Sequence, residues 1–595
     1  MRRKFLTSLS IAVCALCLLF SLSACSADKH VHDWDEWDVT PATCTQDGLR
    51  MRVCKTDRAH KQTQVIDATG HNPSEKFSFD ENNHWHACAV CGHKSEEEPH
   101  ALDTDNICTV CKQVIVKGTA GLLYQPIMIN GKYSEYEVSV GDALNESHIV
   151  IGNYYNGLPV TAISSHGFSN CRNLKSISIP NSITHIGANA FSVCYGLTEV
   201  TLPFGVTEIG GEAFYQCLVL SSIDIPDSVV SIGDGAFEQC VKLKSITIPD
   251  SVTSIGNGAF SHCSDLTEIT LPDGVTEISA QMFAACSALK SFTISNTVTS
   301  IGYFAFGYCE NLMSLVIPDT VTSVGDSLFY NCKSLKSVTL PSSMTEIGMD
   351  MFYGCESLES VTIPSGVTSI GESAFSGCIT LDGISIPSGV TEIDFGAFIN
   401  CEGLTEITIP DGVTEIKPFT FSGCYNLASI VMPANATYIG EHAFMACGSL
   451  ASITIPGGVA RIGDRAFERC ESLTEIIIPD KVTYIGETAF FYCSKLASVT
   501  IGNSVEEIGD SAFEGCRITS VVIPDSVKKI GANAFRFNVT LTSVTIGSGV
   551  KKIGDGAFDY CGIEDVYYNG TEEQWEQIDI GEDNTYLTDA QRHYI

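Results

Sequence analysis

Two closely spaced cysteine pairs are the strongest indication of chemistry in this 595-residue chain. Cys88 and Cys91 form one C-x-x-C pair, Cys108 and Cys111 form another, and sixteen residues separate the two. Four thiolates at this spacing are typical of a structural zinc site, in which two turns each present two sulfurs to a tetrahedral ion. Two disulfides are the alternative, because export would permit them. A closed four-thiolate site leaves no position for water, so the pattern predicts a stabilised module and not a catalytic centre.

A weaker set of metal ligands precedes these pairs. Cys44, Cys54 and His71 are candidates, but Asp57 stands where a C-x-x-C pair beginning at Cys54 would place its second cysteine. A Cys44–Cys54 disulfide is therefore an equal alternative. Three histidines lie close enough to the stronger set to replace a cysteine there, or they are surface residues: His86, His93 and His100. Residues 26–115 contain both sets, and we expect them to form a Cys/His-rich module.

The first 24 residues are predicted to direct export. The basic start "MRRK" is followed by "IAVCALCLLFSL", an apolar stretch too short to span a bilayer comfortably. The segment ends in "LSAC", which resembles the lipobox of bacterial lipoproteins, and this resemblance implies that Cys25 is lipidated on the extracellular face of the cell membrane. An ordinary signal peptide with a chance cysteine is the alternative. No later stretch reaches about 18 apolar residues, so lipid at Cys25 is the only membrane attachment that we predict.

Composition and motifs exclude several classes of function. The formal net charge is −36, from 34 Lys and Arg against 70 Asp and Glu, whereas nucleic-acid binding needs a basic surface. Nucleic acid is therefore excluded as a partner. No G-x-S-x-G elbow, H-E-x-x-H motif or phosphate-binding loop occurs, and the acidic residues recur at polar positions of a repeat, as on a solvated face. We predict that the protein is not an enzyme.

Most of the chain repeats a 23-residue unit, of which "IPDSVTSIGNGAFSHCSDLTEIT" (248–270) is an example. In each unit a stretch such as Leu266–Pro272 alternates apolar and polar residues, which predicts a half-buried strand that ends at the proline. A unit this short has no room for a long helix, so short extended or 3₁₀ segments should form the outer side. A period of 20–29 residues with this pattern is the leucine-rich-repeat signature and predicts a solenoid with parallel strands on its inner face. The repeat is marked by eighteen phenylalanines: Phe168, Phe191, Phe214, Phe237, Phe260, Phe283, Phe306, Phe329, Phe352, Phe375, Phe398, Phe421, Phe444, Phe467, Phe490, Phe513, Phe535 and Phe558.

A cysteine follows the repeated phenylalanine by three residues in seventeen of the eighteen units, from Cys171 to Cys561. Equivalent side chains in stacked units point in parallel, and an odd number of them cannot all form disulfides. We therefore predict buried, reduced thiols that meet backbone groups. Asn538 takes the cysteine position in one unit, which fits this structural role because an amide also pairs with backbone groups.

The ends of the array depart from the repeat. Residues 116–163 are predicted to form an N-terminal cap and residues 566–595 a C-terminal cap, around repeats in 164–565. The unit I-P-x-x-V-x-x-I-G-x-x-A-F-x-x-C closely resembles the BspA-type leucine-rich repeat of bacterial surface proteins, as do the entry "YNGLPVTAI" and the exit "YYNGTEEQW". This resemblance covers about residues 120–595. It implies an adhesin-like protein that binds protein or glycan ligands on host or bacterial surfaces.

A ladder of hydroxyl groups is predicted on the exposed side of the repeated strands. The preference of β-strands for branched residues explains it, and a rigid docking strip is the alternative interpretation. Four apolar residues interrupt the ladder: Val316, Val431, Ile477 and Val522. The ligand-binding residues cannot be placed from this pattern. Two other functions stay open, a metal-binding surface lipoprotein and a structural scaffold of the envelope. The ladder consists of Thr201, Thr247, Thr270, Thr293, Thr339, Thr362, Thr408, Thr454, Thr500 and Thr545, with Ser178 and Ser385.

Overall fold

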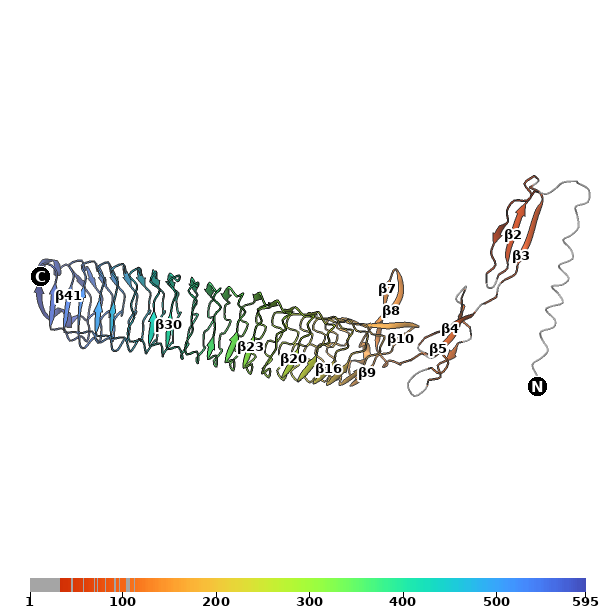
Figure 1. Cartoon of the computed structure of the whole chain (residues 1–595), viewed down its shortest axis with the longest axis horizontal. Helices are drawn as coiled ribbons and strands as arrows, with labels where there is room; N and C mark the ends of the chain where they lie inside the picture. Colours follow the sequence, from red (N-terminus) through yellow and green to blue (C-terminus); the bar gives the residue numbers. More distant parts are fainter. Residues whose placement is uncertain are drawn as a thin grey trace, which may run out of the picture. The chain divides into compact units, whose positions relative to one another are not determined.

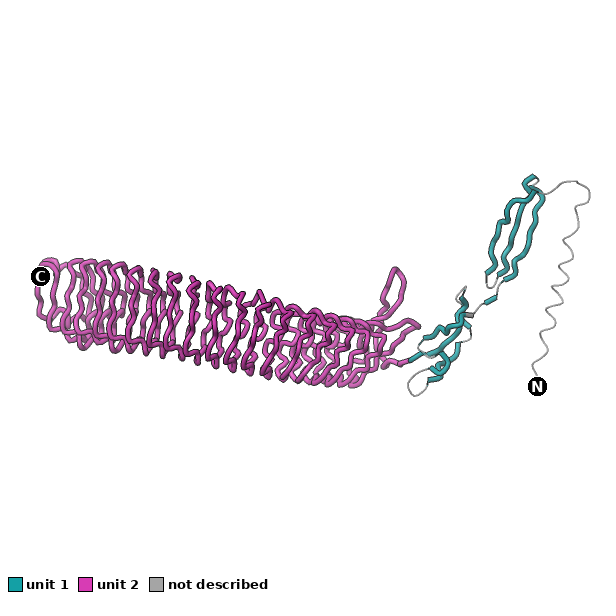
Figure 2. The backbone as a smooth tube through the Cα atoms, in the orientation of Figure 1, with its two compact units in different colours: residues 1–114 teal, residues 115–595 magenta. Residues whose placement is uncertain are grey.

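The computed structural model divides the chain into two compact units, residues 1–114 and residues 115–595 (Figure 2). It describes residues 33–43, 46–56, 58–68, 70–71, 73–80, 82–89, 93–95, 97–102, 108–111 and 113–595. The predicted export signal with Cys25, and the predicted ligands Cys44 and Cys91, lie outside these residues. Among the helices that are described, none has both the length and the apolar character that crossing a membrane requires.

The first unit contains two small antiparallel sheets. The strands of one are β1 (Asp38–Thr40), β2 (Gly48–Val53) and β3 (Lys61–Ile66), and those of the other are β4 (Pro73–Phe79), β5 (Asn83–Cys88) and β6 (Glu98–Pro99). In the described part of this unit the buried apolar residues are one tryptophan and four cysteines: Trp85, Cys54, Cys88, Cys108 and Cys111. A core this small seldom stabilises a domain without a disulfide, a metal ion or a partner.

The second unit begins with a hairpin that projects from the array (Figure 1). It consists of β7 (Leu123–Ile129) and β8 (Lys132–Ser139), and the 3₁₀ helix η1 (Gly141–Ala143), β9 (His148–Val150), β10 (Tyr154–Tyr155) and β11 (Leu158–Ile163) follow. β11 pairs in parallel with β8 on one side and with the first repeat on the other. This segment, where we predicted the N-terminal cap, therefore provides the first strands for the array to stack on.

The repeats form two rows of short parallel strands, which we call the long-strand ladder and the short-strand ladder (Figure 1). Most strands pair with the equivalent strand of the next unit, as Ile246 pairs with Ile269, so the 23-residue spacing sets the register. The pairing is interrupted at some units, for example between β16 (Ser222–Asp224) and β18 (Ser245–Thr247) and between β19 (Ser254–Ile255) and β21 (Glu277–Ile278). The predicted leucine-rich-repeat solenoid with parallel strands and short extended outer segments is confirmed. The long-strand ladder contains β12 (Ser176–Ser178), β14 (Glu199–Thr201), β16 (Ser222–Asp224), β18 (Ser245–Thr247), β20 (Glu268–Thr270), β23 (Ser314–Val316), β25 (Ser337–Thr339), β27 (Ser360–Val361), β30 (Glu406–Thr408), β32 (Ser429–Val431), β35 (Glu475–Ile477), β37 (Ser498–Thr500), β39 (Ser520–Ile523), β41 (Ser543–Ile546) and β43 (Asp565–Tyr568). The short-strand ladder contains β13 (His185–Ile186), β15 (Glu208–Ile209), β17 (Ser231–Ile232), β19 (Ser254–Ile255), β21 (Glu277–Ile278), β22 (Ser300–Ile301), β24 (Ser323–Val324), β26 (Glu346–Ile347), β28 (Ser369–Ile370), β29 (Glu392–Ile393), β31 (Glu415–Ile416), β33 (Tyr438–Ile439), β34 (Arg461–Ile462), β36 (Tyr484–Ile485), β38 (Glu507–Ile508), β40 (Lys529–Ile530) and β42 (Lys552–Ile553).

A column of stacked phenylalanine rings runs through the centre of the array. All eighteen repeated phenylalanines are fully buried, from Phe168 to Phe558. The ring centroids of successive units lie 5.1–6.2 Å apart, and the planes of successive rings differ by at most 21°. This offset-stacked column is the largest shared element of the core, and it joins each unit to both of its neighbours.

The repeated thiols lie beside this column and bond to the backbone. From Cys194 onward, each thiol donates a hydrogen bond to the carbonyl oxygen of the phenylalanine in the preceding unit, at 3.1–3.3 Å. The amide of Asn538 does the same, donating to the Phe513 carbonyl at 2.8 Å. All seventeen thiols are reduced and buried, and burial raises the pKa of Cys217 to about 12. The prediction of structural thiols is confirmed.

The turn around each buried phenylalanine has an unusual backbone. In all eighteen units, the second residue before and the second residue after the phenylalanine have positive φ, and most of these residues are not glycine. The conformation turns the backbone N–H toward the next unit: Val193, at φ 63°, donates to the Tyr215 carbonyl at 2.7 Å. A β-branched residue is strained there, because its Cβ crowds the backbone in the left-handed region.

Replacing Val193 with glycine is expected to stabilise the units around it by about 0.5–1 kcal/mol, because release of the strain exceeds the entropy that glycine loses on folding. Amide hydrogen exchange of the full chain measures the change in the free energy of unfolding of these units. Val230→Gly is the matched control, because Val230 is an exposed residue without positive φ and glycine there should destabilise. Equal destabilisation by both substitutions would show that the turn is not strained.

The last residues add one more coil to both ladders. β44 (Asp579–Ile580) extends the short-strand ladder, and β45 (Gln591–Tyr594) extends the long-strand ladder. Two short helices, α2 (Glu572–Trp575) and α3 (Thr585–Thr588), connect them and bury Trp575 and Leu587. Residues 566–595, where we predicted the C-terminal cap, pack Trp575, Ile578 and Leu587 into the core of the array.

Candidate functional site

Four potential metal ligands come together in the first compact unit, residues 1–114: His84, His100, Cys108 and Cys111. Their ligand atoms all lie within 4.8 Å of one another, and each residue is buried or half-buried. Two imidazoles and two thiolates are a set that zinc binds in tetrahedral structural sites. The arrangement can hold a metal ion and, with four protein ligands, would leave no open position for catalysis.

Strand pairing brings these residues together from distant parts of the sequence. His84 lies on β5 and pairs with Glu98 of β6, and His100 directly follows β6. Cys108 forms an antiparallel bridge with Leu102, and its backbone N–H donates to the Gln113 carbonyl. The second C-x-x-C pair therefore sits in a tight turn that faces the two histidines.

The second nitrogen of each imidazole is directed toward an oxygen. His100 donates from Nε2 to the Asp80 carbonyl at 2.8 Å, which leaves its Nδ1 facing Cys111 Sγ at 3.5 Å. His84 Nδ1 faces Cys108 Sγ at 3.8 Å, and its Nε2 lies 3.9 Å from a carboxylate oxygen of Glu98. Histidines that bind metals commonly donate their other N–H to a carbonyl or carboxylate. The His100 ring is thus oriented as a metal ligand would be, whereas His84 Nε2 forms no hydrogen bond with the described residues and lies beside the Glu98 carboxylate.

The two thiols of this group differ in charge. Burial raises the pKa of Cys108, but hydrogen bonds from the Cys111 backbone and the His100 side chain, among others, outweigh burial and lower it to about 6. Burial and the neighbouring Cys108 raise the pKa of Cys111. At neutral pH the group therefore contains one thiolate, which attracts a cation, and a second thiol that a bound metal would deprotonate.

Among the described cysteines of the predicted four-cysteine site, only Cys108 and Cys111 belong to this group. Cys88 is buried at the end of β5 outside the group, and Cys91 lies outside the described residues, so the four-cysteine composition stays a prediction. Of the nearby histidines, His100 joins the group, whereas His86 Nδ1 lies 2.7 Å from the Ser74 carbonyl oxygen and His93 stacks on His71. The sequence did not single out His84, because no motif spans the 24 residues to Cys108 and only the pairing of β5 with β6 relates them.

The weaker ligand set stays untested. Cys54 is fully buried, and its sulfur lies 3.2 Å from the Thr56 hydroxyl. Its two predicted companions are not seen with it, because Cys44 lies outside the described residues and His71 stacks on His93 with centroids 4.2 Å apart. Both the metal site and the Cys44–Cys54 disulfide remain predictions.

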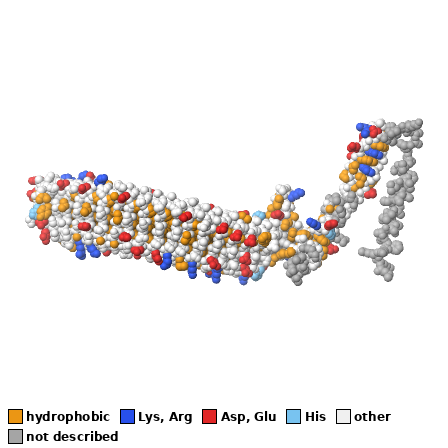
Figure 3. Space-filling view, viewed as in Figure 1, with side chains coloured by type: hydrophobic (Ala, Val, Ile, Leu, Met, Phe, Trp, Pro, Cys, Tyr) orange, Lys and Arg blue, Asp and Glu red, His pale blue; other side chains and the backbone are white. Residues whose placement is uncertain are grey.

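The second candidate site is the exposed side of the long-strand ladder, which we call the strand face. In each three-residue strand the middle residue is buried or nearly so and the outer two project outward. The predicted hydroxyl ladder is exposed as expected, except that Thr545 is half-buried. The four apolar interruptions are also exposed, at 62% for Val316, 55% for Val431, 65% for Ile477 and 61% for Val522. Hydrophobic side chains recur along the face of the array that Figure 3 shows.

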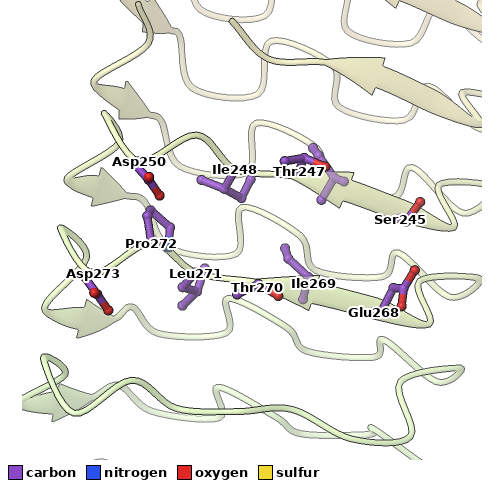
Figure 4. Close-up of a pocket in the computed structure, with 11 residues that line it drawn as sticks. Ser245, Thr247, Ile248, Asp250, Glu268, Ile269, Thr270, Leu271, Pro272 and Asp273 are labelled. Carbon is purple, nitrogen blue, oxygen red and sulfur yellow. The ribbon is translucent and has the colours of Figure 1, made fainter. Parts of the chain in front are cut away.

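Shallow grooves lie on the strand face between neighbouring units. One groove of about 570 Å³ follows β18 and β20, with Thr247 and Thr270 along it (Figure 4). Asp250 and Asp273 stand at one end, and Glu268 stands near the other. A similar groove of about 530 Å³ follows β30 and β32. Hydroxyl and carboxylate groups along an open groove suit an extended polar ligand and do not form an acid–base pair.

The two ladders, the phenylalanine column and the absence of helices from the repeats that the structure describes define a leucine-rich-repeat solenoid. The family model described as "BspA type Leucine rich repeat region" matches residues 161–290, 230–359, 276–394, 345–474 and 460–578. The chain belongs to the BspA-type leucine-rich-repeat family.

Several solved structures are similar to this chain. A leucine-rich repeat protein from Bacteroides ovatus is 25% identical, with a TM-score of 0.40, and the match covers 80% of this chain and 99% of that one. A leucine rich cell surface protein from Faecalibacterium prausnitzii is 24% identical over 78% and 98% of the two chains, with a TM-score of 0.28. The pneumococcal vaccine antigen PcpA is 19% identical over 79% and 98%, also with a TM-score of 0.28. No curated protein matches the chain.

Proposed function

We propose that this protein is exported, anchored by lipid at Cys25, and displayed on the cell surface as a non-catalytic, adhesin-like binding protein. The strand face contacts proteins or glycans on host or bacterial surfaces. Membership of the BspA-type family supports a repeat protein of this kind. The net charge of −36 supports a protein or glycan partner over nucleic acid.

The observation that carries this proposal is the exposure of β-branched residues at one repeated position. Val431, Ile477 and Val522 are each more than half exposed at the same place in their strands, where most other units have threonine. Fixed, rigid strands lose little entropy on binding, so an extended surface of this kind suits a large partner. Apolar points in a hydroxyl-rich strip provide contacts that exclude water.

Binding to immobilised collagen, laminin and fibrinogen, to a glycan array and to bacterial envelope fractions tests the proposal. We expect one of the host or bacterial surface probes to retain the purified full chain. Ile477→Asp and Val431→Asp should each weaken that binding about tenfold, because they introduce a charge into the contact. Val539→Asp is the matched control, since Val539 is 67% exposed but lies outside the long-strand ladder.

Equal loss of binding in all three variants would show that the strand face is not the contact surface. Retention only by envelope fractions of the producing cell would favour the alternative of a structural scaffold. Failure of every probe to retain the full chain would contradict the binding function itself.

A second proposal concerns the first unit: His84, His100, Cys108 and Cys111 hold a structural zinc ion. The directed ring nitrogens, the thiolate at Cys108 and the very small apolar core support it. A metal-handling role is the rival, and it predicts that zinc exchanges while the unit stays folded. A structural ion should instead be lost only with unfolding.

A further inference from the structure

An exposed aromatic cluster interrupts the repeat pattern in the middle of the array. We call it the aromatic patch, and it consists of Tyr303, Phe304, Tyr308, Tyr330 and Tyr353. The rings form a connected set: Phe304 lies 5.6 Å from Tyr330, Tyr308 lies 5.5 Å from Tyr330, and Tyr330 stacks on Tyr353 at 4.6 Å between centroids. Tyr303 and Tyr308 are 49% and 42% exposed. Three consecutive units therefore present one aromatic surface.

The turn backbone explains why these side chains are on the surface. Phe304 and Tyr308 occupy the two positive-φ positions around the buried Phe306, at φ 56° and 58°. The Tyr308 N–H donates to the Tyr330 carbonyl of the next unit at 2.6 Å, which holds the two turns in register. The patch is thus fixed by the solenoid and needs no rearrangement to bind.

Three acidic residues lie on adjacent turns. The Phe304 N–H donates to the Asp326 carbonyl at 2.9 Å, and the Asp350 N–H donates to the Glu372 carbonyl at 2.9 Å, so these acids stand in successive units. Burial and neighbouring groups that include Asp350 raise the pKa of Tyr330, whereas Asp326 Oδ1 accepts the Met349 N–H at 3.0 Å. None of the three carboxylates forms an ion pair within the described chain. Burial, together with the charges of Glu372 and Asp326, raises the pKa of Asp350. The negative charge beside the patch is therefore uncompensated.

Some other aromatic side chains of the array have a cation of their own. Arg172 lies 5.3 Å from the Tyr195 ring, Arg461 lies 4.8 Å from Tyr484, and Arg536 lies 4.5 Å from Phe537. Within the described residues no lysine or arginine covers a ring of the aromatic patch. Lys333, which is in the same unit as Tyr330, pairs with Glu310 at 3.2 Å instead.

We propose that the aromatic patch and its three carboxylates bind a lysine- or arginine-rich segment of a partner protein. The cationic groups lie over the tyrosine rings, and the carboxylates of Asp326, Asp350 and Glu372 neutralise them. Charge complementarity favours this occupant, because three carboxylates without an ion pair attract a cationic segment more strongly than they bind the hydroxyl groups of a neutral glycan. The inference rests on the proposed binding function and adds to it the chemistry of the partner.

Titration calorimetry of the full chain with an octalysine peptide at 150 mM salt, a concentration at which weak surface attraction is screened, tests the inference. Tyr330→Leu removes the ring but keeps an apolar side chain, and Asp350→Asn removes a charge. Each is expected to weaken binding about threefold to tenfold. The matched controls Tyr425→Leu and Glu471→Gln alter exposed residues in distant units and should leave binding unchanged.

A photoreactive octalysine peptide provides a second measurement, because its cross-links show where it binds. Cross-links within residues 303–372 support the inference, whereas cross-links spread over the acidic surface overturn it. Equal binding by all four variants also overturns it, as does displacement of the peptide by a neutral oligosaccharide. If the full chain still binds surface probes in that case, the general binding function stands and only this assignment of the partner fails.

Discussion

Replacing Phe375 with alanine is expected to lower the free energy of unfolding of the surrounding units by about 3–5 kcal/mol. Phe375 is fully buried, and its ring stacks between Phe352 and Phe398 at 5.3 Å on each side. Its loss leaves a cavity that the stacked units cannot close, because the strand register on both sides is fixed by backbone hydrogen bonds. Damage should stay local, since each repeat contacts only its neighbours.

Amide hydrogen exchange of the full chain measures this effect unit by unit. Exchange should accelerate strongly in the units of Phe352, Phe375 and Phe398 and return to the wild-type rate several units away. Phe395→Ala is the matched control, because Phe395 lies in the adjoining unit but is 39% exposed, and its removal should change little. Uniform acceleration along the whole array would show that the solenoid unfolds as one cooperative block and that the cost is not local.

The regular part of this protein follows directly from its sequence. A strict 23-residue step places Ile246 beside Ile269 and Phe237 beside Phe260, so stacking, strand register and the buried thiols follow from the spacing alone. The positive-φ turns do not follow, because residues as different as Val193 and Phe304 occupy them. Positive φ is usually predicted from glycine, which these two positions lack. The hydrogen bond from the backbone N–H to the next unit accounts for the conformation instead.

The aromatic patch and the metal-ligand group lie where the sequence departs from the common 23-residue repeat. The aromatic patch arises because Tyr303 and Tyr308 replace small or polar residues of the common unit, and their contact with Tyr330 depends on how the units stack. In residues 1–114, the spacing of the cysteine pairs predicted metal ligands at Cys108 and Cys111, and both lie in a group that could hold a metal ion. The contribution of His84 could not be predicted, because it depends on antiparallel pairing between strands that have no repeat to fix their register.

Removal of either His84 or Cys108 is expected to lower the zinc affinity of the full chain by on the order of a hundredfold or more. Binding by four such ligands contributes about 10–16 kcal/mol to a small zinc-stabilised fold, so one ligand accounts for several kcal/mol. Competition with a chromogenic chelator measures the affinity of the His84→Ala and Cys108→Ala variants. His86→Ala is the matched control, because it alters the same strand but its ring is directed to the Ser74 carbonyl.

Cobalt substitution distinguishes the ligand sets, because the intensity of the thiolate-to-cobalt absorption band increases with the number of bound sulfurs. Two thiolates are expected, and Cys88→Ala should leave the band unchanged. Loss of intensity in Cys88→Ala, with normal affinity in His84→Ala, would contradict the His84 site and restore the four-cysteine centre.

Because the described part of residues 1–114 buries only Trp85 and four cysteines as apolar residues, chelation of the metal should also unfold the sheet formed by β4, β5 and β6. A unit that stays folded without metal would instead act as a reversible zinc carrier.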